Sequence, residues 1–501
     1  MITSSSKSNL RHNSKDGWPV WLVLALTSVI SMGGYLLVSA VFYRTGFPLD
    51  DAWIHQTYAR NLAYRGEWAF FPGIRSGGST APLWTVLLAV GFLIRLAPYV
   101  WTYLLGAMAL WGISLLGEKA IRQFVPSYHP RIPWVGIVLA FEWHLAWSAG
   151  SGMETLLYAL LVTTVLVLVI SGSRKFTSMG FLIGLSVWVR PDGVTLLGPA
   201  ILIILLNQSS WTKRIRGLIN LGVGFGSLFT FYLLFNEIIS GTPLPNTFYA
   251  KQAEYAVYLQ LPFLARLGSE MLQPLIGAGV ILLPGFILEI VSALRKKAWG
   301  ILAAGAWLLG FICLYAWRLP VTYQHGRYII PAMPIFFLLA LAGLVDFVLR
   351  PSPQRTGWFF ASLWKLGLGA VLVIFYGRGA FAYAQDVAVI ESEMVVTAKW
   401  VANHVPPGSL VAAHDIGALG YFGKHELVDL AGLISPDVIP FLRDEKRMAT
   451  YLTVRGAAYL VAFPDWFPSL TSNSVPVFTT GAPYAPALGE KNMAVYRWPG
   501  P

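Results

Sequence analysis

Long apolar segments recur along most of the chain and predict membrane-spanning helices. The first, Trp18 to Tyr43, has roughly 25 residues, enough to cross a hydrocarbon core of about 30 Å as an α-helix. It is too long for the apolar core of a signal peptide and lacks a convincing small-residue cleavage site, so we expect it to be retained. Further apolar runs follow at 133–149, 154–172, 177–189, 193–207, 217–237, 272–294, 298–318, 327–349 and 359–377. The pattern predicts a polytopic α-helical membrane protein.

Basic residues in the short loops between these runs predict the topology, because positive charge marks the cytoplasmic ends of membrane segments. The clusters are Lys7, Arg11 and Lys15, then Arg174 and Lys175, then 213–216 and 295–297, and finally Arg350 and Arg355. We therefore expect residues 1–17 to form a cytoplasmic leader of a multi-pass protein of the cell membrane. The first loop, 44–81, then lies outside the cytoplasm.

One region fits the charge pattern poorly. Residues 82–118 look like two helices broken near Pro98, whereas the charges of Lys119, Arg122 and Arg131 require an odd number of crossings there. A broken or re-entrant element is tolerated where protein buries it. We estimate about eleven spans over residues 18–377, with nine to thirteen compatible with the pattern.

The chain changes character at residue 378. From there to residue 501 the segments are shorter and are punctuated by Pro, Gly and Asp, and stretches such as "SLVAAHDIGALGYF" and "AAYLVAF" alternate in the manner of strands. We expect a small soluble α/β domain on the extracytoplasmic side. No aromatic platform for a sugar is evident in it.

Composition supports the membrane assignment. The chain is 56% hydrophobic and 12% charged, with a mean hydropathy of +0.60, whereas about a quarter of residues are charged in soluble proteins. The net charge of +12 does not indicate a nucleic-acid partner, because residues 378–501 hold 9 Lys/Arg against 11 Asp/Glu and the excess lies in the membrane half. A single cysteine, Cys313, excludes a disulfide framework and a cysteine-based metal site.

The first loop carries the main candidate chemistry. Asp50 and Asp51 follow the first span, and His55, Tyr58 and Arg60 follow them. An Asp at this position can simply cap a short interfacial helix. Charge at the membrane boundary is costly, however, and tends to mark functional sites.

Other ionisable and polar residues recur at the same predicted outer level. They favour a polar cavity that opens outward, with carboxylates suited to a general base or a metal and with cations suited to a phosphate. "RPDG" also reads as an ordinary turn, and a lone His is more often structural. These residues are Glu154, Arg190, Asp192, Asn246, Tyr249, Lys251, His325 and Arg327.

The order of several motifs resembles the GT-C glycosyltransferases, especially the bacterial branch that includes the terminal arabinofuranosyltransferases of mycobacterial cell walls. The resemblance runs from about residue 44 to 440 and rests on "PLDDAWIHQTYARNLAYRGEWAFFPGIRSGGSTAPLWT", "SGMETLLYALL", "RPDG", "PLPNTFYAK", "GRYIIPAMP" and "HDIGALGYFGKHELVDLAGLISPD". It implies a polyprenyl-phosphate sugar as donor, a glycan, lipid or protein as acceptor, and chemistry on the outer face of the membrane.

The resemblance also implies roles for single residues. An acid of the first loop, Asp50 or Asp51, is expected to be the general base of an inverting transfer. Positive partners are needed by the leaving phosphate, and the candidates are Arg190, Lys251, Arg327 and His325. The remaining candidates are assigned to substrate binding: His55, Tyr58, Arg60, Glu154, Asp192, Asn246 and Tyr249.

Two questions stay open at this level. Adjacent carboxylates with a nearby His could hold Mg²⁺ or Mn²⁺, but an oxygen-ligand site needs more donors than the pair supplies. A transporter or flippase of a lipid-linked sugar would also have many spans and buried charge. It is the alternative, although no inverted repeat is apparent.

Overall fold

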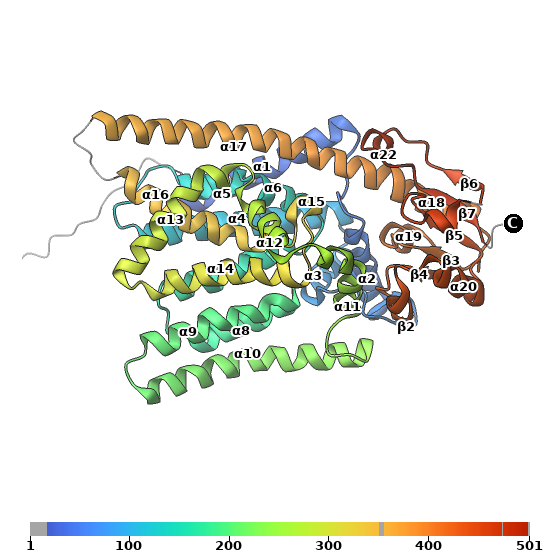
Figure 1. Cartoon of the computed structure of the whole chain (residues 1–501), viewed down its shortest axis with the longest axis horizontal. Coiled ribbons are helices and arrows are strands. Elements are labelled where there is room, and N and C mark those ends of the chain that lie inside the picture. The colour runs from blue at the N-terminus through green and yellow to red at the C-terminus, as the bar shows by residue number, and fades with distance from the viewer. Residues whose placement is uncertain (1–17, 350–354, 473, 499–501) are drawn as a thin grey trace, which may run out of the picture.

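A computed structural model describes residues 18–349, 355–472 and 474–498. Long helices run side by side along the long axis of the molecule, and a small domain containing a β-sheet lies at one end (Figure 1). Helices α2 (Asp51–Arg65) and α11 (Asn246–Glu254) lie at the same end, close to that domain (Figure 1). The end of the helical bundle that faces the small domain therefore carries the predicted outer loops.

Seven segments of the described chain are long and apolar enough to cross a membrane. They are α1 (Val20–Phe42), α4 (Pro98–Phe124), α10 (Trp211–Ser240), α13 (Ala278–Lys296), α14 (Trp299–Arg318), Tyr323–Val345 and Ala361–His404. Four shorter apolar helical segments accompany them: α3 (Pro82–Leu93), α7 (Thr155–Ile170), α8 (Phe176–Val187) and Pro191–Asn207, which joins η1 (Pro191–Leu196) to α9 (Leu197–Asn207). A multi-pass α-helical architecture is confirmed.

The break predicted near Pro98 is confirmed, because α3 ends at Leu93 and α4 begins at Pro98. With twelve residues, α3 extends only about 18 Å, whereas the 27 residues of α4 extend about 40 Å. Only α4 is long enough to cross a core of about 30 Å. One crossing between the first loop and Arg122 satisfies the odd number that the charges require.

The apolar run 133–149 is not one straight helix. It is divided into α5 (Trp134–Phe141) and α6 (Trp143–Gly150) at Glu142. The Glu142 carboxylate accepts hydrogen bonds from the backbone N–H groups of His144 and Leu145, and His144 Nδ1 lies 2.9 Å from Glu142 Oε1. The acid caps the second helix and contacts the His144 ring, so this pair has an internal structural role.

The segment after Tyr323 closes the helical part of the chain. It contains α15 (Tyr323–Gly326), η4 (Ile330–Ala332), α16 (Met333–Leu349), α17 (Arg355–Val389), the π-helix Ile390–Val395 and α18 (Val396–His404). The domain boundary predicted at residue 378 falls inside α17, and helical structure continues from there to His404. The membrane half and the small domain are therefore joined by a continuous helical connection.

The small domain is an α/β domain, as predicted. Its five strands have the order β4-β3-β5-β7-β6, in which β3 pairs in parallel with β4 and β5, and β7 pairs antiparallel with β5 and β6. The stretch 409–422 forms only a short strand and then a helix, because the backbone turns at His414. The strands are β3 (Val411–Ala413), β4 (Leu427–Asp429), β5 (Tyr459–Ala462), β6 (Pro476–Thr479) and β7 (Ala494–Arg497).

The remaining elements are short and lie in loops. They are the hairpin β1 (Ala69–Phe71) and β2 (Ile74–Arg75), the loop helices η2 (Ala256–Gln260), α12 (Phe263–Leu272) and η3 (Gln273–Leu275), and, in the small domain, α19 (Gly417–Phe422), η6 (Pro436–Phe441), α20 (Glu445–Arg455), α21 (Pro468–Thr471) and α22 (Tyr484–Ala487).

Candidate active site

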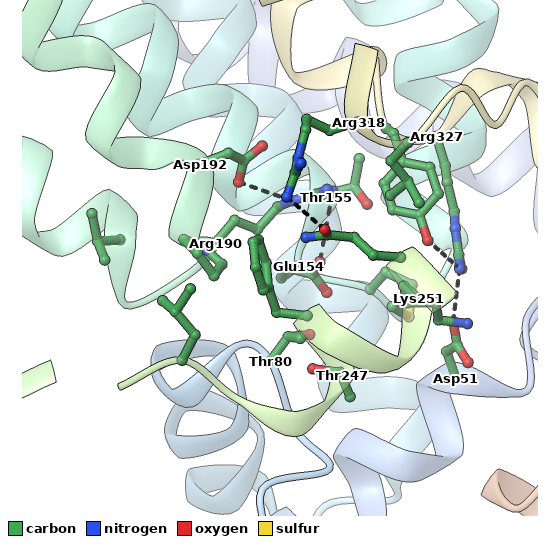
Figure 2. A pocket seen from close by; sticks show the side chains of 18 of the residues that line it. Asp51, Thr80, Glu154, Thr155, Arg190, Asp192, Thr247, Lys251, Arg318 and Arg327 are labelled. Atoms are coloured by element: carbon green, nitrogen blue, oxygen red, sulfur yellow. Dashed lines mark hydrogen bonds and ion pairs between the residues drawn. The ribbon is translucent and has the colours of Figure 1, made fainter. Parts of the chain in front are cut away.

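A cavity of about 430 Å³ lies where the first loop, the ends of several membrane helices and the small domain meet. Ionisable side chains from α2, α7, η1, α11 and α14 project into it (Figure 2). Leu433, which follows β4, contributes to its lining from the small domain. Its ionisable lining residues are Asp51, His55, Glu154, Arg190, Asp192, Lys251, Arg318 and Arg327. The structure thus brings together most of the candidates that lay far apart in the sequence.

Asp51 and Arg327 form an ion pair in this cavity (Figure 2). Arg327 Nη2 lies 2.9 Å from Asp51 Oδ2 and also donates a hydrogen bond to the hydroxyl of Tyr328. The backbone reaches Arg327 through consecutive residues with positive φ, at Gln324 (54°) and His325 (61°), a region that non-glycine residues seldom adopt. Burial would raise the pKa of the Asp51 carboxyl, but Lys251 and Arg327 outweigh it and hold that pKa below its ordinary value. Asp51 is therefore ionised at neutral pH.

Asp50, the other acid of the pair, faces the small domain. Its side chain does not cap α2, at whose N-terminus it lies. Its two oxygens instead accept hydrogen bonds from the backbone N–H groups of Gly417 (2.7 Å) and Ala418 (2.8 Å) at the start of α19. Burial and the charge of Asp415 raise the pKa of Asp50 to about 7, although those two hydrogen bonds oppose the shift. The structure thus gives Asp50 an interdomain contact, and Asp51 the position in the cavity.

The pKa of Asp50 predicts a pH-dependent contact. This pKa is about 7 in the folded protein, against an ordinary 3.8. Between about pH 4 and pH 7 the folded state therefore keeps a proton on Asp50 that the unfolded state has released, so the free energy of unfolding falls as pH rises through this window. We expect thermal stability to fall over this window by an amount of order a few kcal/mol. In Asp50→Asn, that part of the slope should vanish. Thermal unfolding of the full chain below about pH 6 is the clean comparison, because His414 is mostly protonated in both states there.

Arg190 is held from several directions. Its Nη2 donates to the Tyr315 hydroxyl (2.8 Å), its Nε lies 3.5 Å from Asp192 Oδ1, and its Nη1 lies 3.9 Å from Glu154 Oε1. The guanidinium also lies over the ring of Tyr328, 5.2 Å from its centroid. The motif "RPDG" does form a turn, the start of η1, but Arg190 and Asp192 both line the cavity. Both readings of this motif therefore apply.

His55 continues the network on the side of the first loop. Its Nε2 lies 3.5 Å from Glu154 Oε2, and its Nδ1 lies within hydrogen-bonding distance of Ser79 (3.1 Å) and Thr85 (3.4 Å). Burial lowers the pKa of His55 below 6.5, although Glu154 and Asp51 oppose this. The imidazole is therefore neutral at neutral pH and contributes no charge to the cavity.

Lys251 connects the cavity to the small domain. Its ammonium lies 3.5 Å from Glu254 Oε2, and Glu254 Oε1 lies 3.3 Å from His414 Nε2. Burial disfavours the charged amine, but Glu254 and Asp51 raise the pKa of Lys251 well above its ordinary value. Burial would raise the pKa of Glu254, but Lys251 and His414 lower it to about 2. Lys251 is a fixed cation beside Asp51.

Besides Asp50, five predicted site residues lie outside the cavity lining, each with another partner or position. His325 pairs with Asp386 (2.8 Å), Tyr58 bonds Ser76 and Gly78, and Arg60 donates to the carbonyls of Gly420 and Tyr421. Asn246 is buried at the start of α11, and Tyr249 packs edge-on against Phe248. These contacts support the loops and the interdomain surface, and the sequence did not distinguish such support from direct lining.

Sequence reasoning also missed lining residues. Arg318 is the main one: it ends α14, lines the cavity and donates a hydrogen bond to Gln252 (2.8 Å). Tyr315 and Tyr328 line the cavity as well and hold Arg190. A signal existed for Arg318, because it ends an apolar run at the predicted outer level, as Arg190 does.

The residues present do not fit a metal centre built on the acidic pair. Asp50 accepts a hydrogen bond from Gly417 of α19, whereas Asp51 forms an ion pair with Arg327. The two carboxylates therefore do not offer a shared set of oxygen ligands to a metal ion. Over the described residues, no group of three or more His, Cys, Asp or Glu side chains is arranged to hold a metal ion.

Comparison with known proteins adds three findings. Residues 379–496 match a family described as a "Domain of unknown function (DUF8728)". The chain is 26% identical over 363 residues to a terminal β-(1→2)-arabinofuranosyltransferase of Mycobacterium tuberculosis. That alignment covers 64% of this chain and 56% of the relative, so the chain spans little more than half of the length of that protein.

Solved structures share the fold at low identity. ArnT from Cupriavidus metallidurans in the apo state matches with a TM-score of 0.57 and 14% identity, covering 95% of this chain and 97% of ArnT. The apo oligosaccharyltransferase of Archaeoglobus fulgidus matches with a TM-score of 0.59 and 11% identity, covering 89% and 69%. A second ArnT structure, with undecaprenyl phosphate bound, matches with a TM-score of 0.54. The similarity to an arabinofuranosyltransferase and the fold shared with ArnT and an oligosaccharyltransferase agree with the resemblance of the sequence motifs to the GT-C glycosyltransferases.

Proposed function

We propose that this protein transfers a sugar from a polyprenyl-phosphate donor to an acceptor hydroxyl at the outer face of the cell membrane, with inversion and with Asp51 as general base. The main support for this proposal is the position of the Asp51 carboxylate in a cavity that is also lined by Arg190, Lys251, Arg318 and Arg327. The sequence relationship to an arabinofuranosyltransferase and the undecaprenyl phosphate bound by ArnT support the donor class. The cytoplasmic N-terminus and the extracytoplasmic small domain are part of this proposal.

The charges of the cavity suit a phosphate. Its lining includes three carboxylates and four cations, while His55 is neutral. A polyprenyl-phosphate sugar is a phosphodiester with one negative charge, and the departing lipid phosphate is a monoester with a second. Fixed cations that face a developing charge lower the barrier to its formation. The excess of positive charge therefore favours departure of the lipid phosphate.

Unsatisfied polar atoms mark where a ligand would bind. Among the residues that line the cavity, four buried atoms have no hydrogen-bond partner: Arg327 Nη1, Thr247 Oγ1, the Tyr232 hydroxyl oxygen and Glu154 Oε2. A buried donor without a partner costs about 1–3 kcal/mol, which a bound ligand can recover. Arg327 is the cation among these residues, so we assign the phosphate to the Arg327 side of the cavity.

The proposed step needs one base. The acceptor oxygen bonds to the anomeric carbon as the bond from that carbon to the phosphate oxygen breaks, and the hydroxyl proton passes to Asp51. The bonding electrons leave with the lipid phosphate. Asp51 is a weak base while Arg327 and Lys251 hold it. When the donor phosphate takes over those cations, the pKa of the Asp51 carboxyl rises and its basicity increases.

An apolar groove beside the cavity suits the lipid chain. It is lined by Gly310, Cys313, Leu314 and Trp317 on one face of α14 and by Phe263 of α12. Leu314 also lines the charged cavity, so the groove and the cavity meet there. A donor that enters from the bilayer can place its prenyl chain in the groove and its phosphate in the charged cavity, on the Arg327 side.

Filling the groove should discriminate against long donors. Gly310 is exposed, and a Cβ added there would meet nothing within 4 Å, so Gly310→Leu adds apolar bulk to the groove with no clash at its Cβ. We expect kcat/KM to fall roughly tenfold for long-chain donors, the cost of about 1.4 kcal/mol of lost apolar contact, and little for short-chain donors. Gly222→Leu is the matched control, because Gly222 of α10 is equally exposed and open. Equal losses for both chain lengths would contradict the assignment.

A transfer assay tests the function itself. The full chain in lipid nanodiscs is incubated with polyprenyl-phosphate-linked pentoses and hexoses and a mixture of acceptor glycans, and release of the lipid phosphate is measured with product formation. Acceptor-dependent release supports the transferase. Movement of intact donor between leaflets of a vesicle, without release, would instead support the flippase alternative.

A further inference from the structure

The edge of the small domain that faces the membrane half is formed by the carboxyl ends of its parallel strands. Strands β3, β4 and β5 are parallel, so Ala413, Asp429 and Ala462 end at one edge. Loops at such an edge are a frequent place for ligands in α/β folds. The loop after β4 reaches the charged cavity, because Leu433 lines it.

The loop after β3 is in direct contact with the membrane half. His414, its first residue, lies 3.3 Å from Glu254 of α11, and Glu254 pairs with Lys251 in the cavity. Three residues later, the N–H of Gly417 donates to Asp50. A ligand at this edge therefore lies next to the side of the cavity that holds Asp51 and Lys251.

The loop after β5 places an exposed tryptophan beside His414. Trp466 is 42% exposed, although its ring meets the His414 ring edge-on at 5.4 Å and the Phe463 ring at 5.0 Å. The backbone is also held in place here, because the backbone N–H of Trp466 donates to the Phe463 carbonyl. Aromatic contacts with His414 and Phe463 therefore hold the indole in place, and the rest of its surface is exposed to solvent.

Two acids, each paired with a cation, lie beside Trp466 and its neighbour His414. Asp465 precedes Trp466 and pairs with exposed Lys491 (2.9 Å), and Asp415 lies 3.5 Å from His414. Carboxylate oxygens accept hydrogen bonds from hydroxyl groups, and the charge of each of these acids is balanced by a neighbouring cation, Lys491 or protonated His414. An exposed aromatic face bordered by acids is suited to a neutral polyol.

We propose that Trp466, with Asp415 and Asp465, forms the binding platform for a neutral carbohydrate acceptor. The inference rests on the proposed transferase function and names its acceptor class. A sugar ring stacks its C–H face on the indole, its hydroxyl groups donate to the carboxylates, and the chain continues past His414 towards Asp51. Anionic glycans, such as those containing uronic acids, gain no net electrostatic attraction there, because each cation is already paired with an acid. The small domain is then the acceptor-binding part of the enzyme.

Binding measured without donor tests this platform independently of catalysis. The probes are short neutral oligosaccharides of arabinose, galactose, mannose and glucose, and an oligogalacturonate of equal length, titrated against the full chain in nanodiscs. We expect a neutral oligosaccharide to bind and Trp466→Ala to weaken it roughly tenfold, the loss of one aromatic stacking contact. Trp466→Phe should retain part of the affinity. Val454→Ala, at an exposed apolar position on α20 of the same domain, should leave it unchanged.

The outcomes separate this proposal from the transferase assignment. Absence of binding by every neutral probe, unchanged affinity in Trp466→Ala, or preference for the oligogalacturonate would overturn the platform. If transfer occurs but the acceptor KM is the same in Trp466→Ala as in wild type, the platform is wrong and the transferase stands. If neutral sugars bind through Trp466 but no donor is ever cleaved, the platform stands and the proposed function fails.

Discussion

Replacement of Asp51 by Asn is expected to lower sugar transfer by about 10²–10⁴-fold, the contribution typical of a general base. The amide cannot accept the hydroxyl proton, while its size and its oxygen are nearly those of the carboxylate. Asn also leaves Arg327 without its ionic partner, so the donor phosphate should bind at least as well as in wild type. The measurement is kcat for lipid-phosphate release beside the Kd for the unreactive polyprenyl phosphate.

Asp50→Asn is the matched control for this experiment. It changes the neighbouring residue in the same chemical way, but the contacts it alters are those with Gly417 and Ala418. We expect it to remove the pH dependence of stability that Asp50 causes and to leave kcat within a few-fold of wild type. A collapse of kcat in Asp50→Asn together with normal turnover in Asp51→Asn would assign the base to the other acid.

The pH profile tests how Asp51 is poised. In the free protein its pKa lies below the ordinary value, because Lys251 and Arg327 outweigh burial. The plot of kcat/KM, which reports the free enzyme, should therefore show no acid limb from Asp51 above about pH 4. The plot of kcat, which reports the complex, should show an acid limb at higher pH if the donor phosphate takes over these cations. Identical acid limbs in both plots would count against that exchange.

Arg327→Gln is expected to produce the second large effect, a loss of roughly 10²–10³-fold in turnover, as for removal of one preorganised donor from a site of developing charge. Arg327 donates to Asp51 and Tyr328 and keeps one buried nitrogen without a partner. Its removal also leaves the Asp51 carboxylate without its nearest partner, and breaking a buried ion pair in this way costs about 3–5 kcal/mol of stability. Turnover and thermal unfolding are measured together.

The double variant separates the two losses. Combining Arg327→Gln with Asp51→Asn removes both charges, so stability should recover relative to Arg327→Gln alone while activity remains lost. Arg318→Gln is the comparison for position, because Arg318 bonds only the amide oxygen of Gln252 among the hydrogen bonds described and has no ion pair in the described chain. We expect it to raise the donor KM by a few-fold. Full activity in Arg327→Gln would refute the phosphate assignment.

The periodicity and charge of the sequence determined the class of fold. Apolar runs that match the thickness of a bilayer can have few other structures, because the backbone must satisfy its own hydrogen bonds in lipid. The break before Pro98 and the strand Tyr459–Ala462 followed from local residue chemistry. Local chemistry did not reveal the capping of α6 by Glu142, because that role depends on a helix break within an apolar run.

The sequence predicted only part of the candidate site. Charges at the ends of apolar runs are costly, so their presence alone indicated Asp51, Glu154, Arg190, Lys251 and Arg327, all of which line the cavity. The same reasoning also selected side chains that support neighbouring loops. The free-energy cost of placing a charge there is the same whether the side chain contacts a ligand or another part of the protein.

What the sequence by itself determined is that acids and cations gather at the outer ends of membrane helices. Only the tertiary structure decided which of two adjacent acids faces which partner. Asp51 begins α2 and meets Arg327, 276 positions later in the chain, whereas Asp50 meets the N–H groups of Gly417 and Ala418. Adjacent side chains on a helix project about 100° apart, so neighbours in sequence enter different surroundings. Those surroundings are made by residues hundreds of positions away, and local sequence carries no information about them.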